Sequence, residues 1–173
     1  MNAPTGSLLQ LTAAGIRFVE NLAAIALLIA IVVDVSLQVV FRYVLSHPLS
    51  WSSELATYLF EWLTVLGMAI AQRERAHLAV QFFADRSPAV RDALRWLAWG
   101  VSLVFFALLL FGGYFFFAGD TIQSGPATGI PLWAVYSCLP VGAALGLYHV
   151  LYDLPRVIAL RHSPQADLRP GHR

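Results

Sequence analysis

Lysine is absent from this 173-residue chain, and charged residues of either sign are scarce. The 11 basic residues are all arginine, ten acidic residues nearly cancel them, and the charged fraction is 12%. A net charge of +1 therefore offers no basic surface to nucleic acid. The single cysteine, Cys138, excludes an intramolecular disulfide. Hydrophobic residues dominate instead, at 58% of the chain, which is more than an ordinary soluble domain contains.

Sequence motifs of the common enzyme classes are absent as well. The chain contains no HExxH, Walker-type loop, GxSxG or CxxC pattern. A haem-binding bundle needs two histidines at matching depth on facing helices, and only His149 lies within a long apolar stretch. We therefore expect no enzyme activity, no cofactor and no metal site.

Four apolar stretches are long enough to cross a bilayer, which takes about 20 residues of helix because lipid cannot satisfy backbone amides. They are residues 21–41, 51–71, 96–118 and 130–152. These stretches predict an all-α integral membrane protein with a bundle of four transmembrane helices. We treat residues 1–173 as one membrane domain whose polar C-terminal tail is 153–173.

The connections between the spans differ in character. The first is a short turn with His47-Pro48, and the third is a linker rich in glycine and proline. In the second connection, residues 72–95, apolar and polar side chains fall on different helical faces, which predicts an amphipathic helix lying along the membrane surface. Ser87 followed by Pro88 is typical of a new helix start that leads into the third span.

The arginines are distributed very unevenly about the predicted spans. Only Arg42 lies on one side of the membrane, and the other ten lie on the opposite side. Positive residues near span ends are retained in the cytoplasm. We therefore expect both termini to be cytoplasmic, with the first span uncleaved.

Polar side chains interrupt the first two spans. Asp34, Gln38 and Arg42 follow one stripe of the first helix at four-residue spacing. Glu54 and Glu61 share one face of the second helix. Counting from the ends of these antiparallel helices places Asp34 and Glu61 at similar depth. Because a buried charge in lipid needs a partner, and no arginine lies in the centre of any span, we expect part of this polar surface to dock against another membrane subunit.

Two groups of residues form a recognisable pattern, one around the second span and one at the entry to the fourth. The first group is Phe41-Arg42-Tyr43-Val44, Pro48-Leu49-Ser50-Trp51, Glu54-Leu55, Tyr58-Leu59-Phe60, Trp62, Leu66-Gly67, Arg73 and His77-Leu78. The second group is Gly129-Ile130-Pro131-Leu132-Trp133, Tyr136, Leu139-Pro140 and Gly142. Together they resemble the small membrane subunit of TRAP (tripartite ATP-independent periplasmic) transporters, the DctQ-like family, over residues 42–152. Two departures are Ser53-Glu54, where the family often has paired acids, and Gln81, near which it commonly has an Asp.

This resemblance implies a scaffold subunit in a bacterial inner-membrane system that takes up organic acids, such as dicarboxylates or sugar acids, with an ion gradient, usually sodium. The implied partners are a large DctM-like permease subunit, which carries the substrate and ion sites, and a periplasmic DctP-like solute-binding protein. Membrane lipid surrounds the subunit, and no nucleic acid is involved. The transported compound is not encoded in this chain.

The resemblance also implies a structural cluster of Arg42, Trp51 and Glu54 near the outer surface, in which Arg42 and Glu54 are close enough in sequence to pair. Gly67 either allows a neighbouring helix to approach closely or is a glycine of the kind that is common in membrane helices. His77 either caps or orients the surface helix or is an ordinary cytoplasmic histidine. Our full prediction for a subunit interface or structural polar cluster is Asp34, Gln38, Arg42, Trp51, Glu54, Tyr58, Glu61, Trp62, Gly67 and His77.

Two other functions fit a small polar-faced membrane protein. A membrane anchor subunit of a redox enzyme would also expose polar helix faces to a partner and would lie beside a cofactor. A small autonomous channel or transporter would use Asp34 and Glu61 directly. A visible absorption spectrum would identify the first, and ion movement by the reconstituted chain alone would identify the second.

Overall fold

The protein consists of helices joined by short connections. The computed structural model describes residues 5–82, 88–119 and 123–159, and side chains over residues 12–74, 93–119 and 123–154. The helices are α1 (Thr5–Tyr43), α2 (Ser52–Phe82), α3 (Pro88–Gly119), α4 (Leu132–Tyr136) and α5 (Cys138–Ala159). Four stretches of helix are long and apolar enough to cross a membrane: Thr12–Tyr43, Ser52–Glu74, Ala93–Gly119 and Leu132–Leu154. The predicted all-α fold with four transmembrane helices is confirmed.

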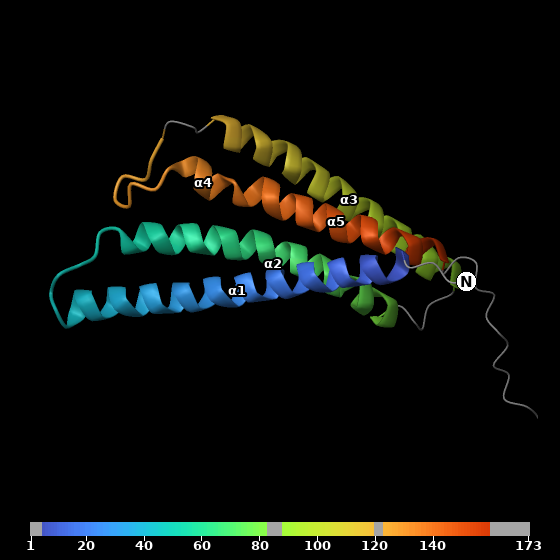
Figure 1. Cartoon of the computed structure of the whole chain (residues 1–173), viewed down its shortest axis with the longest axis horizontal. Coiled ribbons are helices and arrows are strands. Elements are labelled where there is room, and N and C mark those ends of the chain that lie inside the picture. The colour runs from blue at the N-terminus through green and yellow to red at the C-terminus, as the bar shows by residue number, and fades with distance from the viewer. Residues whose placement is uncertain (1–4, 83–87, 120–122, 160–173) are drawn as a thin grey trace, which may run out of the picture.

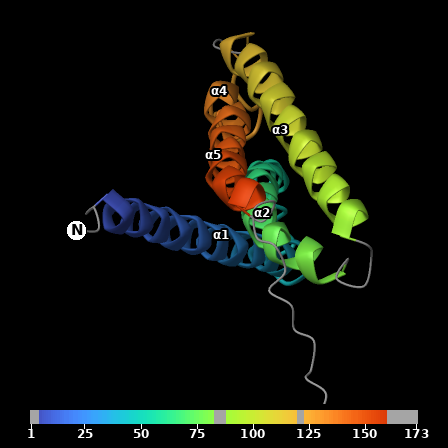
Figure 2. The ribbon, with the colours of Figure 1, turned by 90° about the vertical axis from the view of Figure 1, so that its right-hand side faces the viewer.

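The spans are arranged as a layer with two inner and two outer helices. α1 packs against α2, α2 packs against α5, and α5 packs against α3. Figure 1 shows the helices side by side in this order, and Figure 2 shows α1 and α3 diverging toward opposite edges. α1 begins, and α2 and α5 end, at one end of the molecule, which we call the N-terminal end. The two outer helices therefore leave much of their surface uncovered.

Two glycines of α5 allow its neighbours on both sides to come close. A methyl group on Gly142 would overlap the side chain of Val65 in α2, and one on Gly146 would overlap the ring of Phe106 in α3. Val65 and Phe106 are themselves buried. Small residues at such positions are the usual device for packing membrane helices, because lipid supplies no hydrophobic drive between them. These contacts hold α5 between α2 and α3.

The fourth span is built from two helices. α4 ends at Tyr136 and α5 begins at Cys138, so Ser137 interrupts the helix. Pro140 has no N–H group, and the carbonyl group of Tyr136 therefore lacks its usual helical donor. At the same break, the Ser137 hydroxyl group donates a hydrogen bond to the carbonyl oxygen of Ala134 at 2.7 Å. The predicted single span is thus a broken one.

The second connection begins as a continuation of α2. The helix runs without interruption to Phe82, beyond the predicted end of the second span. Side chains 75–92 lie outside the described residues, so the orientation of this segment along the membrane surface stays a prediction. α3 begins at Pro88, as the sequence indicated, while Ser87 lies outside the described residues.

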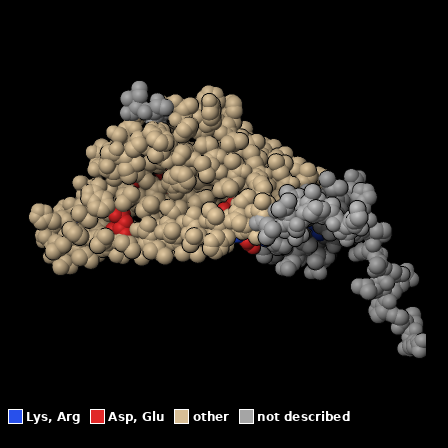
Figure 3. All heavy atoms as spheres, in the orientation of Figure 1, with Lys and Arg blue, Asp and Glu red and all other residues tan. Residues whose placement is uncertain are grey.

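Large apolar side chains cover the outward surfaces of the two outer helices. On α1 they include Ile25, Leu28, Ile29, Val32 and Val33, and on α3 they include Leu97, Val101, Val104, Leu108 and Phe111. The face drawn in Figure 3 is almost uncharged, with a few acidic side chains and, beside one of them, a basic one. Such a surface is stable in lipid and not in water.

Candidate functional site

Hydrogen-bonded polar side chains form two groups among the described residues, one at each end of the layer. We call the group at the N-terminal end the Glu20 network, which comprises Glu20, Asn21, Arg73, Glu74 and His149. We call the group at the opposite end the Glu54 clamp, which comprises Glu54, Tyr58, Ala127 and Thr128. Each is organised around one carboxyl group.

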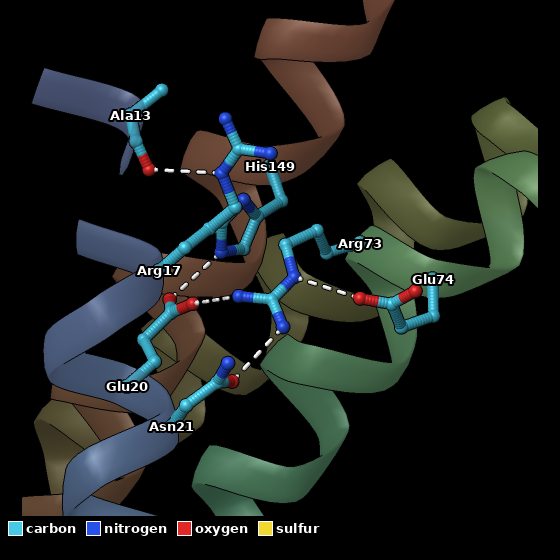
Figure 4. A network of polar contacts seen from close by, with 7 residues as sticks. All are labelled: Ala13, Arg17, Glu20, Asn21, Arg73, Glu74 and His149. Carbon is cyan, nitrogen blue, oxygen red and sulfur yellow. Dashed lines mark hydrogen bonds and ion pairs between the residues drawn. The ribbon is translucent and has the colours of Figure 1, made fainter. Parts of the chain in front are cut away.

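The carboxyl group of Glu20 is buried where three helices meet. The residue is 2% exposed. Its Oε1 lies 2.7 Å from Nε2 of His149 in α5, and its Oε2 accepts a hydrogen bond from Nη1 of Arg73 in α2 at 3.1 Å. Figure 4 shows both partners directed toward this one carboxyl group. The contact with His149 is notable because α1 and α5 are not neighbours in the layer.

Arg73 connects the network to further residues. Its Nη2 donates to Oδ1 of Asn21 at 3.0 Å, and its Nε donates to Oε1 of Glu74 at 3.1 Å (Figure 4). The guanidinium group therefore bridges two acids, of which Glu20 is buried and Glu74 is exposed. A planar guanidinium with five donors suits this task, and a lysine ammonium would satisfy fewer of these acceptors in fixed directions.

A small pocket opens beside the network. Its lining is Ala13, Arg17, Arg73, Tyr148, His149, Tyr152 and Asp153. Arg17 is held at its edge by a 3.0 Å hydrogen bond from Nε to the carbonyl oxygen of Ala13, one turn earlier in α1. The lining carries both signs of charge, so the pocket has no strong preference for an anion or a cation.

At the other end, the carboxyl group of Glu54 holds the connection between α3 and α4. Oε2 accepts hydrogen bonds from the backbone N–H groups of Ala127 at 2.8 Å and Thr128 at 3.3 Å. Oε1 accepts from the hydroxyl group of Thr128 at 3.0 Å and from the hydroxyl group of Tyr58, one turn along α2. The donors are all formally neutral, in contrast to those of Glu20.

The clamped connection is a tight turn that closes on itself. The N–H group of Gly125 donates to the Ile130 carbonyl oxygen at 2.9 Å, and that of Gly129 donates to the Gly125 carbonyl oxygen at 2.9 Å. Gly129 has a φ of +69°, a conformation that disfavours other residues. Gly125 lies so close to Glu54 that an added methyl group would overlap the carboxyl oxygen. The predicted glycine- and proline-rich linker therefore folds against α2.

The buried carboxyl group of Asp34 contacts Ser52, and not Glu61, whose depth residue counting had matched to that of Asp34. Its Oδ2 accepts a 3.0 Å hydrogen bond from the hydroxyl group of Ser52, and the two residues are 6% and 0% exposed. Ser52 begins α2, and Glu61 lies about 14 Å further along that helix at 1.5 Å per residue. The expectation that Asp34 and Glu61 lie at similar depth is therefore wrong. α1 extends beyond the start of α2, and the connection returns alongside it (Figure 1).

The other predicted residues are more scattered. Within the described part of the chain no ion pair joins Arg42 to Glu54; the guanidinium group of Arg42 lies 5.7 Å from the centre of the Tyr43 ring. Trp51 is 39% exposed. Gln38, Glu61, Trp62 and Gly67 are half-buried, and His77 belongs to α2 with a side chain outside the described residues. The structure thus brings together Glu54 with Tyr58, but leaves the predicted group as a whole dispersed.

Sequence reasoning missed the Glu20 network. The predicted first span began at residue 21 and the second ended at 71, which placed Glu20 and Arg73 just outside the membrane. The predicted span bounds could still have indicated this ion pair. Glu20 and Arg73 have opposite charges and flank the ends of two antiparallel spans that lie on the same side of the membrane. His149 was considered only as a haem ligand, and its depth near the same end of the fourth span could have linked it to Glu20.

Comparison with known proteins gives one family. The sequence profile described as "Tripartite ATP-independent periplasmic transporters, DctQ component" matches residues 17–160. This range contains the buried acids Glu20 and Asp34 and the half-buried Glu54, together with Arg73 and His149.

Individual relatives carry related names. The chain is 29% identical over 147 residues to the sialic acid TRAP transporter small permease protein SiaQ of Vibrio cholerae, covering 84% of this chain and 83% of the relative. It is 30% identical over 125 residues to the C4-dicarboxylate TRAP transporter small permease protein DctQ of Pseudomonas aeruginosa, covering 69% and 60%. It is 26% identical over 143 residues to the isethionate TRAP transporter permease protein DctMQ of Oleidesulfovibrio alaskensis, covering 75% of this chain but 22% of that longer protein.

Proposed function

Because this chain belongs to the DctQ component family of tripartite ATP-independent periplasmic transporters, we propose that it is the small membrane subunit of an uptake system for organic acids. The family match over residues 17–160 is the observation that carries this proposal. The three relatives above are named for sialic acid, C4-dicarboxylates and isethionate, which are all organic anions. An organic acid is therefore the substrate class, and the individual compound is set by the partners.

The proposed partners are a large DctM-like permease subunit and a DctP-like periplasmic solute-binding protein, and the proposed driving force is an ion gradient, in particular sodium. The DctMQ relative supports the first partner, because a segment similar to this chain there forms 22% of one permease protein. The family match does not favour the alternative of a redox anchor subunit.

Three hydrogen-bonded acids support a scaffold role for this chain. Glu20 is held by Arg73 and His149, Asp34 by Ser52, and Glu54 by the turn at 123–131. Each carboxyl group joins two or more elements of the fold. Glu20 lies at the N-terminal end, whereas Asp34, which contacts Ser52, and Glu54, two residues along α2 from Ser52, lie toward the opposite end. Among the described residues no cluster of three or more metal-ligating side chains occurs. The contacts of Glu20, Asp34 and Glu54 fix the shape of this subunit, while substrate and ions bind on the large permease subunit.

We also propose that both termini are cytoplasmic. The arginines on the side that holds both chain ends outnumber those on the other side ten to one, and arginine near span ends is retained in the cytoplasm. In this orientation the Glu20 network faces the cytoplasm and the Glu54 clamp faces the periplasm.

Reconstitution tests the function directly. Proteoliposomes that contain this chain and the large permease subunit from the same genome, with the solute-binding protein outside, should accumulate a labelled organic acid when a sodium gradient is imposed. A panel of sialic acid, a C4-dicarboxylate and isethionate covers the chemistry of the relatives. Liposomes with this chain alone should accumulate none. Uptake by this chain alone, or undiminished uptake without it, would contradict the proposal.

A further inference from the structure

α2 lies inside the layer, yet one of its faces is uncovered. Ser52 and Leu66 are buried on the side of α1, and Val65 is buried against Gly142 of α5. The uncovered residues recur every three or four positions and so lie on one side of the helix. We call them the open face of α2: Ser53, Thr57, Phe60, Thr64, Gly67 and Ala71, of which Gly67 is half-buried and the others are exposed.

The open face differs chemically from the other exposed surfaces of the protein. All of its residues except Phe60 are small, whereas α1 and α3 expose large aliphatic and aromatic side chains. The hydroxyl groups of Thr57 and Thr64 donate back to the carbonyl oxygens of Ser53 at 3.0 Å and Phe60 at 2.8 Å, so neither needs water. Small residues on a membrane helix allow another helix to approach closely, which is their common role at helix contacts in lipid.

Glu61 borders this face on the side of α5. It lies about 14 Å along α2 from Ser52, well inside the apolar span that runs to Glu74. The residue is half-buried, and no hydrogen bond or ion pair within the described part of the chain involves its carboxyl group. Tyr58, one turn earlier, donates to Glu54 instead. A carboxyl group at this depth is stable only with a hydrogen-bonding or charged partner.

Resting on the proposed function, we propose that the open face of α2 docks a transmembrane helix of the large permease subunit and that this helix carries a hydrogen-bond donor opposite Glu61. The face lies within a membrane span, so its partner is itself a membrane helix. The DctMQ relative supports the identity of the partner, because there the similar segment and the rest of the permease form one protein. A second copy of this chain is a poor partner, since pairing two open faces would bring two Glu61 side chains together.

Substitution of a glycine tests the docking surface. Gly67 on α2 and Gly112 on α3 are both half-buried helical glycines, and a methyl group added to either would meet no atom within 4 Å. Each leucine variant, Gly67→Leu and Gly112→Leu, is co-expressed with the large subunit, purified through a tag on this chain, and assayed for the large subunit recovered per small subunit.

We expect Gly67→Leu to lower the recovered large subunit at least about fivefold and Gly112→Leu to lower it less than about twofold, since close helix approach is lost only on α2. Equal effects of the two variants, or none from Gly67→Leu, would overturn the docking surface while leaving the proposed function intact. Failure of the wild-type chain to recover any large subunit would refute the proposed function and this inference with it.

Photo-crosslinking provides a second measurement that does not depend on a bulky variant. Benzoylphenylalanine replaces Thr64 on the open face or, as the matched control, Leu108 on the outward surface of α3. Irradiation of membranes should give an adduct with the mass of the large subunit from position 64 and only lipid adducts from position 108. A dimer of this chain, or only lipid adducts, from position 64 would overturn the proposal.

The role of Glu61 is tested by two substitutions in the same co-purification. Glu61→Gln keeps an oxygen acceptor, whereas Glu61→Leu removes it. Because hydrogen bonds between membrane helices are modest, we expect Leu to lower recovery about threefold to tenfold and Gln to retain at least half. Full recovery with Glu61→Leu would show that the partner presents no donor at this position.

Discussion

The two ends of the layer each hold one acid, the buried Glu20 and the half-buried Glu54, and they do so in opposite ways. At the N-terminal end, Glu20 is matched by the guanidinium group of Arg73 and by His149, each from a different helix. At the other end, Glu54 is matched by backbone N–H and hydroxyl groups, most of them from one turn. The first arrangement joins three helices through an ion pair with Arg73 and a contact with His149, and the second fixes a loop through several neutral donors. Removing one partner should therefore be more damaging at the first end than at the second.

The largest loss in the free energy of unfolding is expected from Arg73→Ala, because this substitution leaves the carboxyl group of Glu20 buried without its cation. Breaking a buried ion pair on one side destabilises a protein by about 3 to 5 kcal/mol. Denaturant unfolding of the purified chain in detergent measures this. Arg42→Ala is the matched control, since Arg42 is exposed and forms no ion pair with a described residue. Equal stability of the two variants would contradict the ionic account of the N-terminal end.

A smaller loss of stability is expected from Gly125→Ala at the opposite end of the layer. The added methyl group overlaps the Glu54 carboxyl oxygen and the Tyr58 hydroxyl group, so Glu54 must move and its hydrogen bonds to the turn weaken. A loss of about 1 to 3 kcal/mol follows, comparable to leaving a polar group poorly satisfied. Thermal unfolding measures it. Gly100→Ala, where a methyl group would meet no atom within 4 Å, should be neutral or slightly stabilising.

Glu54→Gln tests the same Glu54 clamp without adding a steric overlap. The amide keeps one acceptor oxygen but presents an NH₂ group to the donors of the turn, which should weaken the contact between α2 and the turn. Limited proteolysis within residues 123–131 is the sharpest measurement, because the loop is released before the helices unfold. Glu74→Gln, on an exposed side chain of the same helix, should leave the cleavage rate unchanged. Unchanged cleavage in both variants would show that the carboxyl group does not hold the turn.

The sequence alone predicted the elements far better than their contacts. Apolar length fixes the four spans, because a bilayer imposes one minimum length on every helix. It does not fix the order of the helices in the layer, which depends on close approach at residues such as Gly142 and Gly146. Depth counting also failed for Asp34, since the overhang of α1 past the start of α2 depends on the path of the connection. The Glu54 clamp was unpredictable for the same reason, because it pairs residues more than 70 positions apart.

The smallest effect is a predicted absence of coupling between Asp34 and Glu61. Asp34 contacts Ser52 at the start of α2, and Glu61 lies about 14 Å further along that helix, with no partner in common. Mutations that far apart add to within about 0.3 to 0.5 kcal/mol. Asp34→Asn, Glu61→Gln and the double variant form the cycle, measured by unfolding of the purified chain. A coupling energy above about 1 kcal/mol would mean that the two carboxyl groups do meet, as counting from the span ends suggested, and that α1 is displaced along α2.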